Sequence, residues 1–191
     1  MDRKGLEAGH NSPVTIELMD AAAIADAIRD ASRHFAHLEK KQKLYVIGLA
    51  TRGVPLAVRL TEELKKAGID AVAGSLDPSF HRDDYHTRRN LKMPSGELEL
   101  LHNVEGAGVL LVDDVLHTGR SVRAALSALL DYGRPKYVRL WVLIERSGRE
   151  LPIAADLSGM TLEGRVKGDV RVKLKETDGM ETVYLVEGTQ R

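Results

Sequence analysis

The sequence contains no cysteine, which excludes disulfide bridges and thiolate chemistry. It has no net charge either, because 28 lysines and arginines balance 28 aspartates and glutamates. Its overall charge therefore does not indicate a nucleic acid or an anionic membrane as partner. No apolar stretch approaches the ~20 residues of a membrane span, and the polar start, MDRKGLEAGHNSP, lacks the apolar segment of a secretory signal. These absences predict a soluble cytoplasmic protein.

The 191 residues suffice for one compact domain. Apolar stretches suited to buried strands alternate with amphipathic helical patterns along the chain. Strands are expected at 14–18, 44–50, 69–76, 109–112 and 137–144, with helices after 20, 53 and 121. This alternation predicts an α/β fold in which helices cover both faces of a parallel sheet. Near the end of the chain, alternating apolar residues predict a β-hairpin with Asp178-Gly179 at its turn.

The chain is expected to consist of a disordered tail at 1–12 and a single domain at 13–191. The periodic pattern fails between about 80 and 106, where HRDDYHTRRN is followed by a proline and two glycines. A polar segment of this length inside a compact domain predicts a flexible lid. Residues of about 145–170 are expected to form a small hood over the carboxyl edge of the sheet, where such folds bind ligands.

The most informative segment is VLLVDDVLHTGRS, residues 109–121. A hydrophobic strand ends in two carboxylates, Asp113 and Asp114, and a turn with hydroxyls and Gly119 leads into a helix. Backbone N–H groups and the positive end of the helix dipole favour a phosphate at such a turn. The carboxylates would repel a phosphate, so they suit the hydroxyls of a neighbouring ribose. The alternative is an acidic turn with an N-capping hydroxyl and no ligand.

This segment lacks the GxxxxGK pattern of nucleoside-triphosphate loops. It resembles the signature with which type I phosphoribosyltransferases bind 5-phosphoribosyl 1-diphosphate (PRPP). Over nearly its whole length the chain resembles the pyrimidine-operon attenuator / uracil phosphoribosyltransferase family. The other segments that carry the resemblance are IGLATRG at 47–53, LDPSFHRDD at 76–84 and DYGRPKYVRLWVLIERSGRELPI at 131–153. The resemblance implies a type I phosphoribosyltransferase fold and the conversion of uracil and PRPP to UMP and pyrophosphate.

The resemblance also implies which residues form the site. The implied PRPP-binding residues are Thr51, Arg52 and Gly53, then Arg82, then Asp113, Asp114, Val115, Leu116, His117, Thr118, Gly119, Arg120 and Ser121. Arg146 and Val170 are expected to border the base or nucleotide. Asp113, Asp114 and Arg52 are expected to be catalytic. A guanidinium in a glycine-bearing loop suits a pyrophosphate on chemical grounds too, although an ordinary strand–helix turn with a surface arginine is the alternative.

Transfer at a ribose carbon that bears pyrophosphate resembles glycosyl transfer, so the transition state should have oxocarbenium character. The protein must hold PRPP, stabilise the departing pyrophosphate and exclude water. Mg²⁺ is expected to bind mainly through PRPP, without a dedicated metal site. His117 stands where hypoxanthine–guanine relatives have an acidic residue and the attenuator family commonly has tyrosine, which argues against a purine enzyme. It is either a catalytic base or a partly exposed loop side chain.

Three functions remain open: a uracil phosphoribosyltransferase that also regulates transcription, an RNA-binding attenuator with little catalysis, and a phosphoribosyltransferase for another base such as a purine. Several basic residues that are common in the family are replaced here, at Asp30, Gly148, Ala154 and Gly159-Met160. This loss predicts weak RNA binding. Basic residues that could compensate in part are Arg29, Arg33, Arg149, Arg165 and Lys167. The resemblance also implies a homodimer or a higher homo-oligomer.

Overall fold

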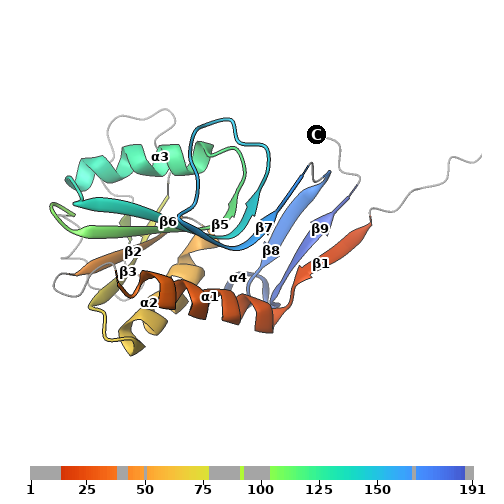
Figure 1. The fold of residues 1–191 in the computed structure, drawn as a ribbon, viewed down its shortest axis with the longest axis horizontal. Helices are drawn as coiled ribbons and strands as arrows, with labels where there is room; N and C mark the ends of the chain where they lie inside the picture. The colour runs from red at the N-terminus through yellow and green to blue at the C-terminus, as the bar shows by residue number, and fades with distance from the viewer. Residues whose placement is uncertain are drawn as a thin grey trace, which may run out of the picture.

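The computed structural model describes residues 14–37, 43–49, 51–77, 104–164 and 167–187, together with the backbone of 91–92. Strands and helices alternate along much of this part of the chain (Figure 1). The elements are β1 (Thr15–Met19), α1 (Ala21–Phe35), β2 (Leu44–Leu49), α2 (Gly53–Lys66), β3 (Ala71–Leu76), β4 (Leu91–Lys92), β5 (Gly108–Leu116), α3 (Arg120–Leu129), the 3₁₀ turn η3 (Leu130–Tyr132), β6 (Tyr137–Arg146), β7 (Leu157–Leu162), β8 (Asp169–Lys173), α4 (Lys175–Asp178) and β9 (Thr182–Val186).

The main sheet of the described residues has the strand order β4-β3-β2-β5-β6-β7. Strands β3, β2, β5, β6 and β7 are parallel, and the short β4 runs antiparallel to β3. Every residue of β2 is buried, as are the first six residues of β5. Strands covered on both faces read as continuous apolar runs, which explains why the sequence pattern located them. The predicted α/β fold with a parallel sheet is confirmed.

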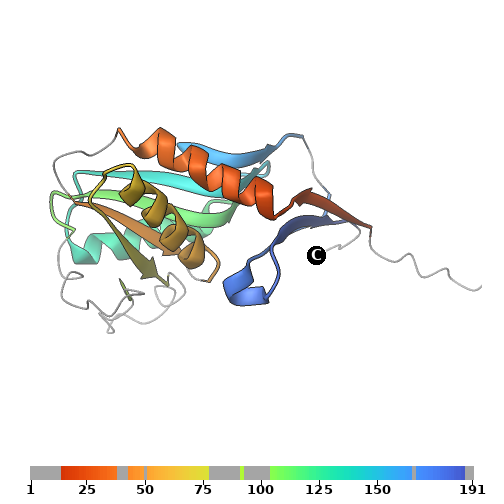
Figure 2. The same ribbon diagram turned by 90° about the horizontal axis from the view of Figure 1, so that it is seen from below.

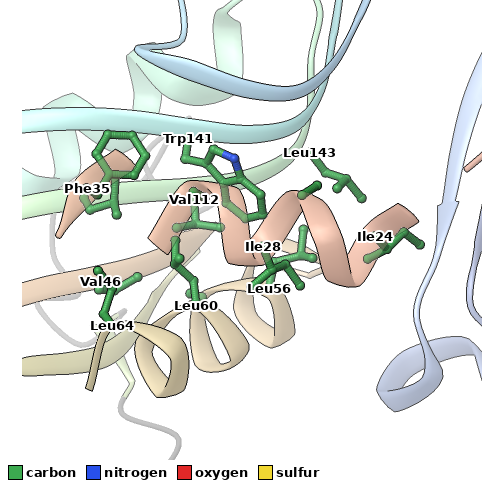
Figure 3. Packing of buried hydrophobic residues seen from close by; sticks show 14 of the residues in the cluster. Ile24, Ile28, Phe35, Val46, Leu56, Leu60, Leu64, Val112, Trp141 and Leu143 are labelled. Atoms are coloured by element: carbon green, nitrogen blue, oxygen red, sulfur yellow. The ribbon is translucent and has the colours of Figure 1, made fainter. Parts of the chain in front are cut away.

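Helices cover both faces of this sheet, as predicted. Helices α1 and α2 lie on one face (Figure 2), where Phe35, Leu60 and Leu64 pack with Trp141 of β6 (Figure 3). Helix α3 covers the opposite face and forms a second cluster with the other side of the strands. Asp20 is the N-cap of α1 and accepts a hydrogen bond from the backbone N–H of Ala23 at 2.8 Å. The two clusters therefore fix the sheet between its helical layers.

A second, antiparallel sheet has the order β1-β9-β8 and joins the N-terminal strand to the end of the chain. Strands β8 and β9 form the predicted hairpin, but the connection contains α4 instead of a tight Asp178-Gly179 turn. Asp178 ends α4, and Gly179 adopts a left-handed conformation with φ of +71°. The expected hood at 145–170 is distributed differently, because residues 157–162 form β7 at the edge of the main sheet. Strand β8 begins at residue 169 and belongs to the small sheet.

Some predictions concern residues that the structure does not describe. These are the tail at 1–12 and most of the predicted lid at about 80–106, including Arg82. In the part of the chain that is described, no helix is both long enough and apolar enough to cross a membrane.

Candidate active site

The predicted pyrophosphate loop lies against the end of β5. Strands β2 and β5 are parallel neighbours, so the loop 51–53 after β2 emerges beside the carboxylates of β5. A Cβ atom on Gly53 would lie only 2.4 Å from the carbonyl oxygen of Val112, and one on Gly48 would lie 2.4 Å from the carbonyl oxygen of Gly53. Such a close backbone approach requires glycine at both positions. The two glycines therefore bring Thr51 and Arg52 next to Asp113.

Asp113 and Asp114 form a partly buried carboxylate pair. Asp113 is only 8% exposed. Its Oδ1 accepts a hydrogen bond from the backbone N–H of Asp114 at 2.9 Å, and Oδ1 of Asp114 accepts one from Val115 at 2.9 Å. Burial, reinforced by the charge of Asp114, raises the pKa of Asp113 well above its usual value. A buried carboxylate of this kind favours a partner that brings hydroxyl donors or positive charge.

The turn after β5 has the features of a phosphate site. Gly119 is the N-cap of α3 and adopts φ of +86°, a conformation that favours glycine. Glycine brings no side-chain acceptor to cap the helix, although the N–H of Arg120 makes a long hydrogen bond of 3.4 Å to Oγ1 of Thr118. An N-terminus without a capping side chain is suited to bind an anion. The carbonyl of Thr118 accepts hydrogen bonds from the N–H groups of Glu150 and Leu151 at 3.1 and 3.2 Å. These bonds hold the turn against the segment after β6, as does the Arg120 Nε to Glu150 Oε2 bond of 2.8 Å.

A cavity of about 310 Å³ opens beside the carboxylates. Its lining residues are Val115, His117, Arg146, Asp169, Val170 and Arg171. Arg146 and Val170, predicted to border the base, are thus brought together from different sheets. The Nη1 group of Arg146 donates to the carbonyl of Gly168 at 2.9 Å, which ties the start of β8 to the end of β6. The volume is at the small end of the range for ligand pockets, about 300–1,000 Å³.

His117 is exposed at this cavity and lies over Gly148. A Cβ atom on Gly148 would lie 2.7 Å from Nε2 of His117, so a larger residue at 148 would displace the imidazole. His117, which the sequence places in a loop, therefore lines the wall of the cavity.

Arg52 has a partner that the sequence did not reveal. Its Nε and Nη2 donate to the two carboxylate oxygens of Asp178 at 3.1 and 2.9 Å. This ion pair raises the pKa of Arg52 above its usual value, and the negative charge of Asp114 adds to the effect. Arg52, Lys173 and Thr177 together hold the pKa of Asp178 well below its ordinary value. The guanidinium therefore lies between the small sheet and the carboxylates of β5.

Sequence reasoning missed three residues of this region. Asp169 and Arg171 line the cavity but alternate with Val170 in a strand, where charged residues ordinarily face solvent. Asp178 precedes a glycine, and the dipeptide was interpreted as a hairpin turn. Asp169 and Arg171 could have been predicted as site residues because they flank Val170, which is expected to border the base. Nothing local pointed to the contact between Asp178 and Arg52, which are 126 positions apart.

No group of three or more histidine or acidic side chains suited to a metal ion occurs among the described residues. The chemistry of Asp113 and Asp114 nevertheless fits a Mg²⁺ ion that arrives with a phosphorylated ligand, since Mg²⁺ usually binds through substrate phosphates and one or two carboxylates. A nearby cation would offset the burial and the charge of Asp114 that raise the pKa of Asp113.

Comparison with known proteins identifies the family to which the chain belongs. Residues 15–177 match the family model of the phosphoribosyl transferase domain. The chain belongs to the phosphoribosyltransferase family. Its relatives include a bifunctional protein PyrR of Synechococcus sp., 43% identical over 181 residues, with 92% of this chain and 97% of the relative covered. A bifunctional protein PyrR of Enterococcus faecalis is 36% identical over 176 residues and covers 91% and 98%. Within the phosphoribosyltransferases, the chain is thus a member of the PyrR family.

Solved phosphoribosyltransferases share the fold. A hypoxanthine-guanine phosphoribosyltransferase from Bacillus anthracis superposes with a TM-score of 0.66 at 13% identity, over 91% of this chain and 97% of the other. The hypoxanthine phosphoribosyltransferase of Trypanosoma cruzi in complex with IMP gives 0.66 at 15% identity, over 94% and 97%. At these identities the likeness concerns the fold alone. The type I phosphoribosyltransferase fold predicted from the sequence is confirmed.

Proposed function

We propose that this PyrR-family phosphoribosyltransferase transfers the 5-phosphoribosyl group of PRPP to uracil, forming UMP and pyrophosphate. The observation that supports this most is the grouping of three features at one edge of the sheet. These are the carboxylates Asp113 and Asp114, the Gly119 turn at the start of α3, and the cavity that contains Arg146 and Val170. Between them they offer groups that suit the ribose, the 5-phosphate and the base of a nucleotide.

In the proposed reaction, the bond between the anomeric ribose carbon and the pyrophosphate oxygen breaks, and a bond from that carbon to N1 of uracil forms. The N1 proton leaves to solvent or to a base. Asp113 and Asp114 accept hydrogen bonds from the ribose hydroxyls and stabilise positive charge on the ring. Arg52 and the N–H groups of the 51–53 loop stabilise the leaving pyrophosphate. When bound, Mg²⁺ supplies charge neutralisation to the pyrophosphate, and Asp113 and Asp114 are the residues that would hold it.

The cavity supports a small polar base. Its wall combines Val170 with the charged groups of Arg146 and Asp169, so it offers an apolar surface and hydrogen-bonding groups of both kinds. The tie between Arg146 and the Gly168 carbonyl fixes the backbone next to Val170. His117 occupies the position at which hypoxanthine–guanine relatives have an acidic residue, and this difference favours a pyrimidine.

A steady-state assay of PRPP consumption with uracil, hypoxanthine, guanine and orotate tests the proposal. Turnover is expected with uracil and not with the other bases. The same preparation carrying Asp113→Asn and Asp114→Asn serves as the control for contaminating enzymes from the expression host. Turnover of a purine or of orotate in preference to uracil would assign a different base. Absence of turnover with every base would refute the catalytic proposal.

A second function, binding of pyrimidine-operon leader RNA, is implied by the family resemblance, and the relatives are named bifunctional. The surface of α1 argues against strong RNA binding here. Arg29 is ion-paired with Asp26, and Arg33 with Asp30, within the same helix. We infer that catalysis is the principal activity and that RNA binding is weak.

A further inference from the structure

The contact between Arg52 and Asp178 joins distant parts of the chain at the active site. Arg52 lies in the loop before α2, and Asp178 ends α4 in the connection between β8 and β9. The Nε–Oδ2 distance is 3.1 Å and the Nη2–Oδ1 distance is 2.9 Å. Two parallel hydrogen bonds of this kind fix the plane of a guanidinium as well as its position. The contact with Asp178 therefore fixes the position and orientation of the Arg52 guanidinium.

Asp178 is held in place by groups other than Arg52. Its side chain is only 9% exposed. It accepts hydrogen bonds from the backbone N–H of Leu174 at 3.1 Å, from Oγ1 of Thr177 at 2.7 Å and from Nζ of Lys173 at 2.9 Å. These three donors orient the carboxylate independently of Arg52. Asp178 thus has the properties of a fixed anchor and not of a mobile surface acid.

The small helix α4 does not depend on Asp178 for its attachment to α2. Arg59 of α2 donates from Nε and Nη2 to the two carboxylate oxygens of Glu176, at 2.8 and 2.7 Å. Arg59 is also paired with Glu181, which follows α4. These contacts dock the β8–β9 connection onto α2 one helical turn or more away from Arg52. The effect of Asp178 on Arg52 can therefore be separated from the docking of α4.

A guanidinium has five N–H donors, and the contact with Asp178 uses two of them. We propose that Asp178 is a positioning residue for phosphoribosyl transfer, which holds Arg52 so that its other N–H groups meet the pyrophosphate of PRPP. The inference rests on the proposed function, because that reaction releases pyrophosphate at the 51–53 loop. A flexible arginine would lose side-chain entropy on binding the pyrophosphate, and a held arginine has already lost it.

The test is a double-mutant cycle on Arg52 and Asp178. Asp178→Asn keeps the size of the side chain and an oxygen acceptor, but it removes the charge and one of the two acceptors for Arg52. Its kcat/KM for PRPP is expected to fall by about 10- to 100-fold, the scale of a misplaced catalytic group, while KM for uracil stays unchanged. In an Arg52→Ala background, Asp178→Asn is expected to change kcat/KM by less than about twofold, because the group it positions is gone. Asp178→Glu, which keeps the charge and moves the carboxylate by one methylene, is expected to lose less than Asp178→Asn.

Glu176→Gln is the matched control, since it removes an ion pair from the same helix without contacting Arg52. It is expected to keep the kcat/KM of the wild type within about twofold, by the additivity of independent sites. An equal loss in Glu176→Gln would show that docking of α4 is what matters and would overturn the inference. Equal fold losses from Asp178→Asn in both backgrounds would also overturn it. So would a lower KM for PRPP in Asp178→Asn, because Asp178 would then compete with the pyrophosphate for Arg52.

Calorimetric titration with PRPP, without any base, separates this inference from the proposed function. If the wild type binds PRPP and the cycle shows coupling in PRPP affinity, the positioning role stands even if uracil is not converted. If UMP forms and the two variants act additively on PRPP binding, only the positioning role fails. If the wild type does not bind PRPP, both fail.

Discussion

Oδ1 of Asp113 accepts the backbone N–H of the adjacent Asp114 at 2.9 Å, so the first carboxylate of the pair is fixed by the residue that carries the second. The bond partly compensates Asp113 for its burial, but the charge of Asp114 acts in the opposite direction. The outcome is a raised pKa for Asp113, as expected when two carboxylates share a low-dielectric site. The buried carboxylate pair lowers the stability of the ligand-free protein, and it is useful when a ligand binds.

The first prediction is that Asp113→Asn stabilises the free protein at neutral and alkaline pH. Because the pKa of Asp113 is higher in the folded chain than in the unfolded one, the wild type loses stability as pH rises from the unfolded value of about 3.9 toward the folded value. Asparagine cannot ionise, and its oxygen can still accept the Asp114 N–H. The gain is expected to be about 0.5–2 kcal/mol, or about 2–4 °C in Tm per kcal/mol.

Thermal unfolding at pH 8 and at pH 4 measures this difference. The stabilisation should be present at pH 8 and clearly smaller at pH 4, because a raised pKa of Asp113 lowers the stability of the wild type only as the pH rises above the unfolded value of about 3.9. Asp26→Asn on the exposed surface of α1 is the control and should show no such dependence. A Tm at pH 8 equal to or below that of the wild type would mean that Asp113 is stabilised by contacts beyond those described.

The second prediction is that replacing both carboxylates by asparagine impairs catalysis. Asp113→Asn combined with Asp114→Asn should reduce turnover by about 100-fold or more, the scale of losing a group that stabilises transition-state charge, while the fold survives. Steady-state kinetics with uracil and PRPP, alongside circular dichroism, provide the measurement. Turnover close to that of the wild type would assign the two acids a structural or solvated role.

The third prediction concerns Gly119, whose φ of +86° strains any residue with a Cβ atom. Gly119→Val should weaken PRPP binding by at least about 10-fold, because a shifted turn no longer presents its N–H groups to the phosphate. A Cβ at this position would lie 3.4 Å from Leu151 and 3.5 Å from Ile153, which are ordinary contacts, so the backbone conformation is strained even where the Cβ itself is not crowded.

Gly68→Val is a matched control for this change. Gly68 adopts φ of +82° after α2, and a Cβ there would meet nothing within 4 Å. Both variants should lose stability by a similar amount, about 1–3 kcal/mol for a residue in a strained conformation, and only Gly119→Val should lose PRPP affinity. Calorimetric titration gives the comparison. Equal PRPP affinity in a folded Gly119→Val protein would remove the turn from the phosphate site.

What the sequence predicted well was local. The run from Asp113 to Ser121 holds two carboxylates, a glycine and two hydroxyls within nine residues, and the structure forms the strand end, turn and helix start that this spacing predicts. The phosphate at the turn stays a prediction. Strands such as β2 were located because burial on both faces leaves an uninterrupted apolar run. Gly48, Gly53 and Gly119, which have close contacts or a positive φ, also lie within or next to the sequence motifs of the site.

What it did not predict depends on long-range pairing. The order β1-β9-β8 joins the two ends of the chain, and no local pattern reports which strands become neighbours. The same holds for the contact of Arg52 with Asp178, where a turn-like dipeptide provides a buried acid. Residues 157–162 lie within the stretch expected from the sequence to form a hood, yet pairing with β6 makes them an edge strand of the main sheet.

The last prediction is that this protein binds pyrimidine-operon leader RNA weakly. Affinity for RNA depends strongly on cation–phosphate contacts, and each neutralised cation reduces it. On α1, Asp26 and Asp30 each pair with an arginine one turn later, and beyond β6 Arg149 is paired with Glu145. Carboxylates that pair with these arginines offset their positive charge and so weaken their attraction to phosphates. At near-physiological salt we therefore expect a Kd of about micromolar or weaker, in the range of non-specific binding.

A fluorescence titration against a leader hairpin and a scrambled hairpin of equal length measures this affinity. Asp26→Asn with Asp30→Asn is the informative variant, because it releases Arg29 and Arg33 without adding a cation. Suppose that α1 belongs to an RNA-binding surface and that only its paired aspartates offset the charge of its arginines. The variant should then bind RNA several-fold more tightly. Its affinity should also depend more steeply on salt concentration, since more counterions are released. Glu63→Gln on α2 removes a comparable i,i+3 ion pair elsewhere and should change nothing. Nanomolar binding of the wild type that discriminates between the two hairpins would contradict the prediction, because it would mean that the replaced basic residues are not required for recognition.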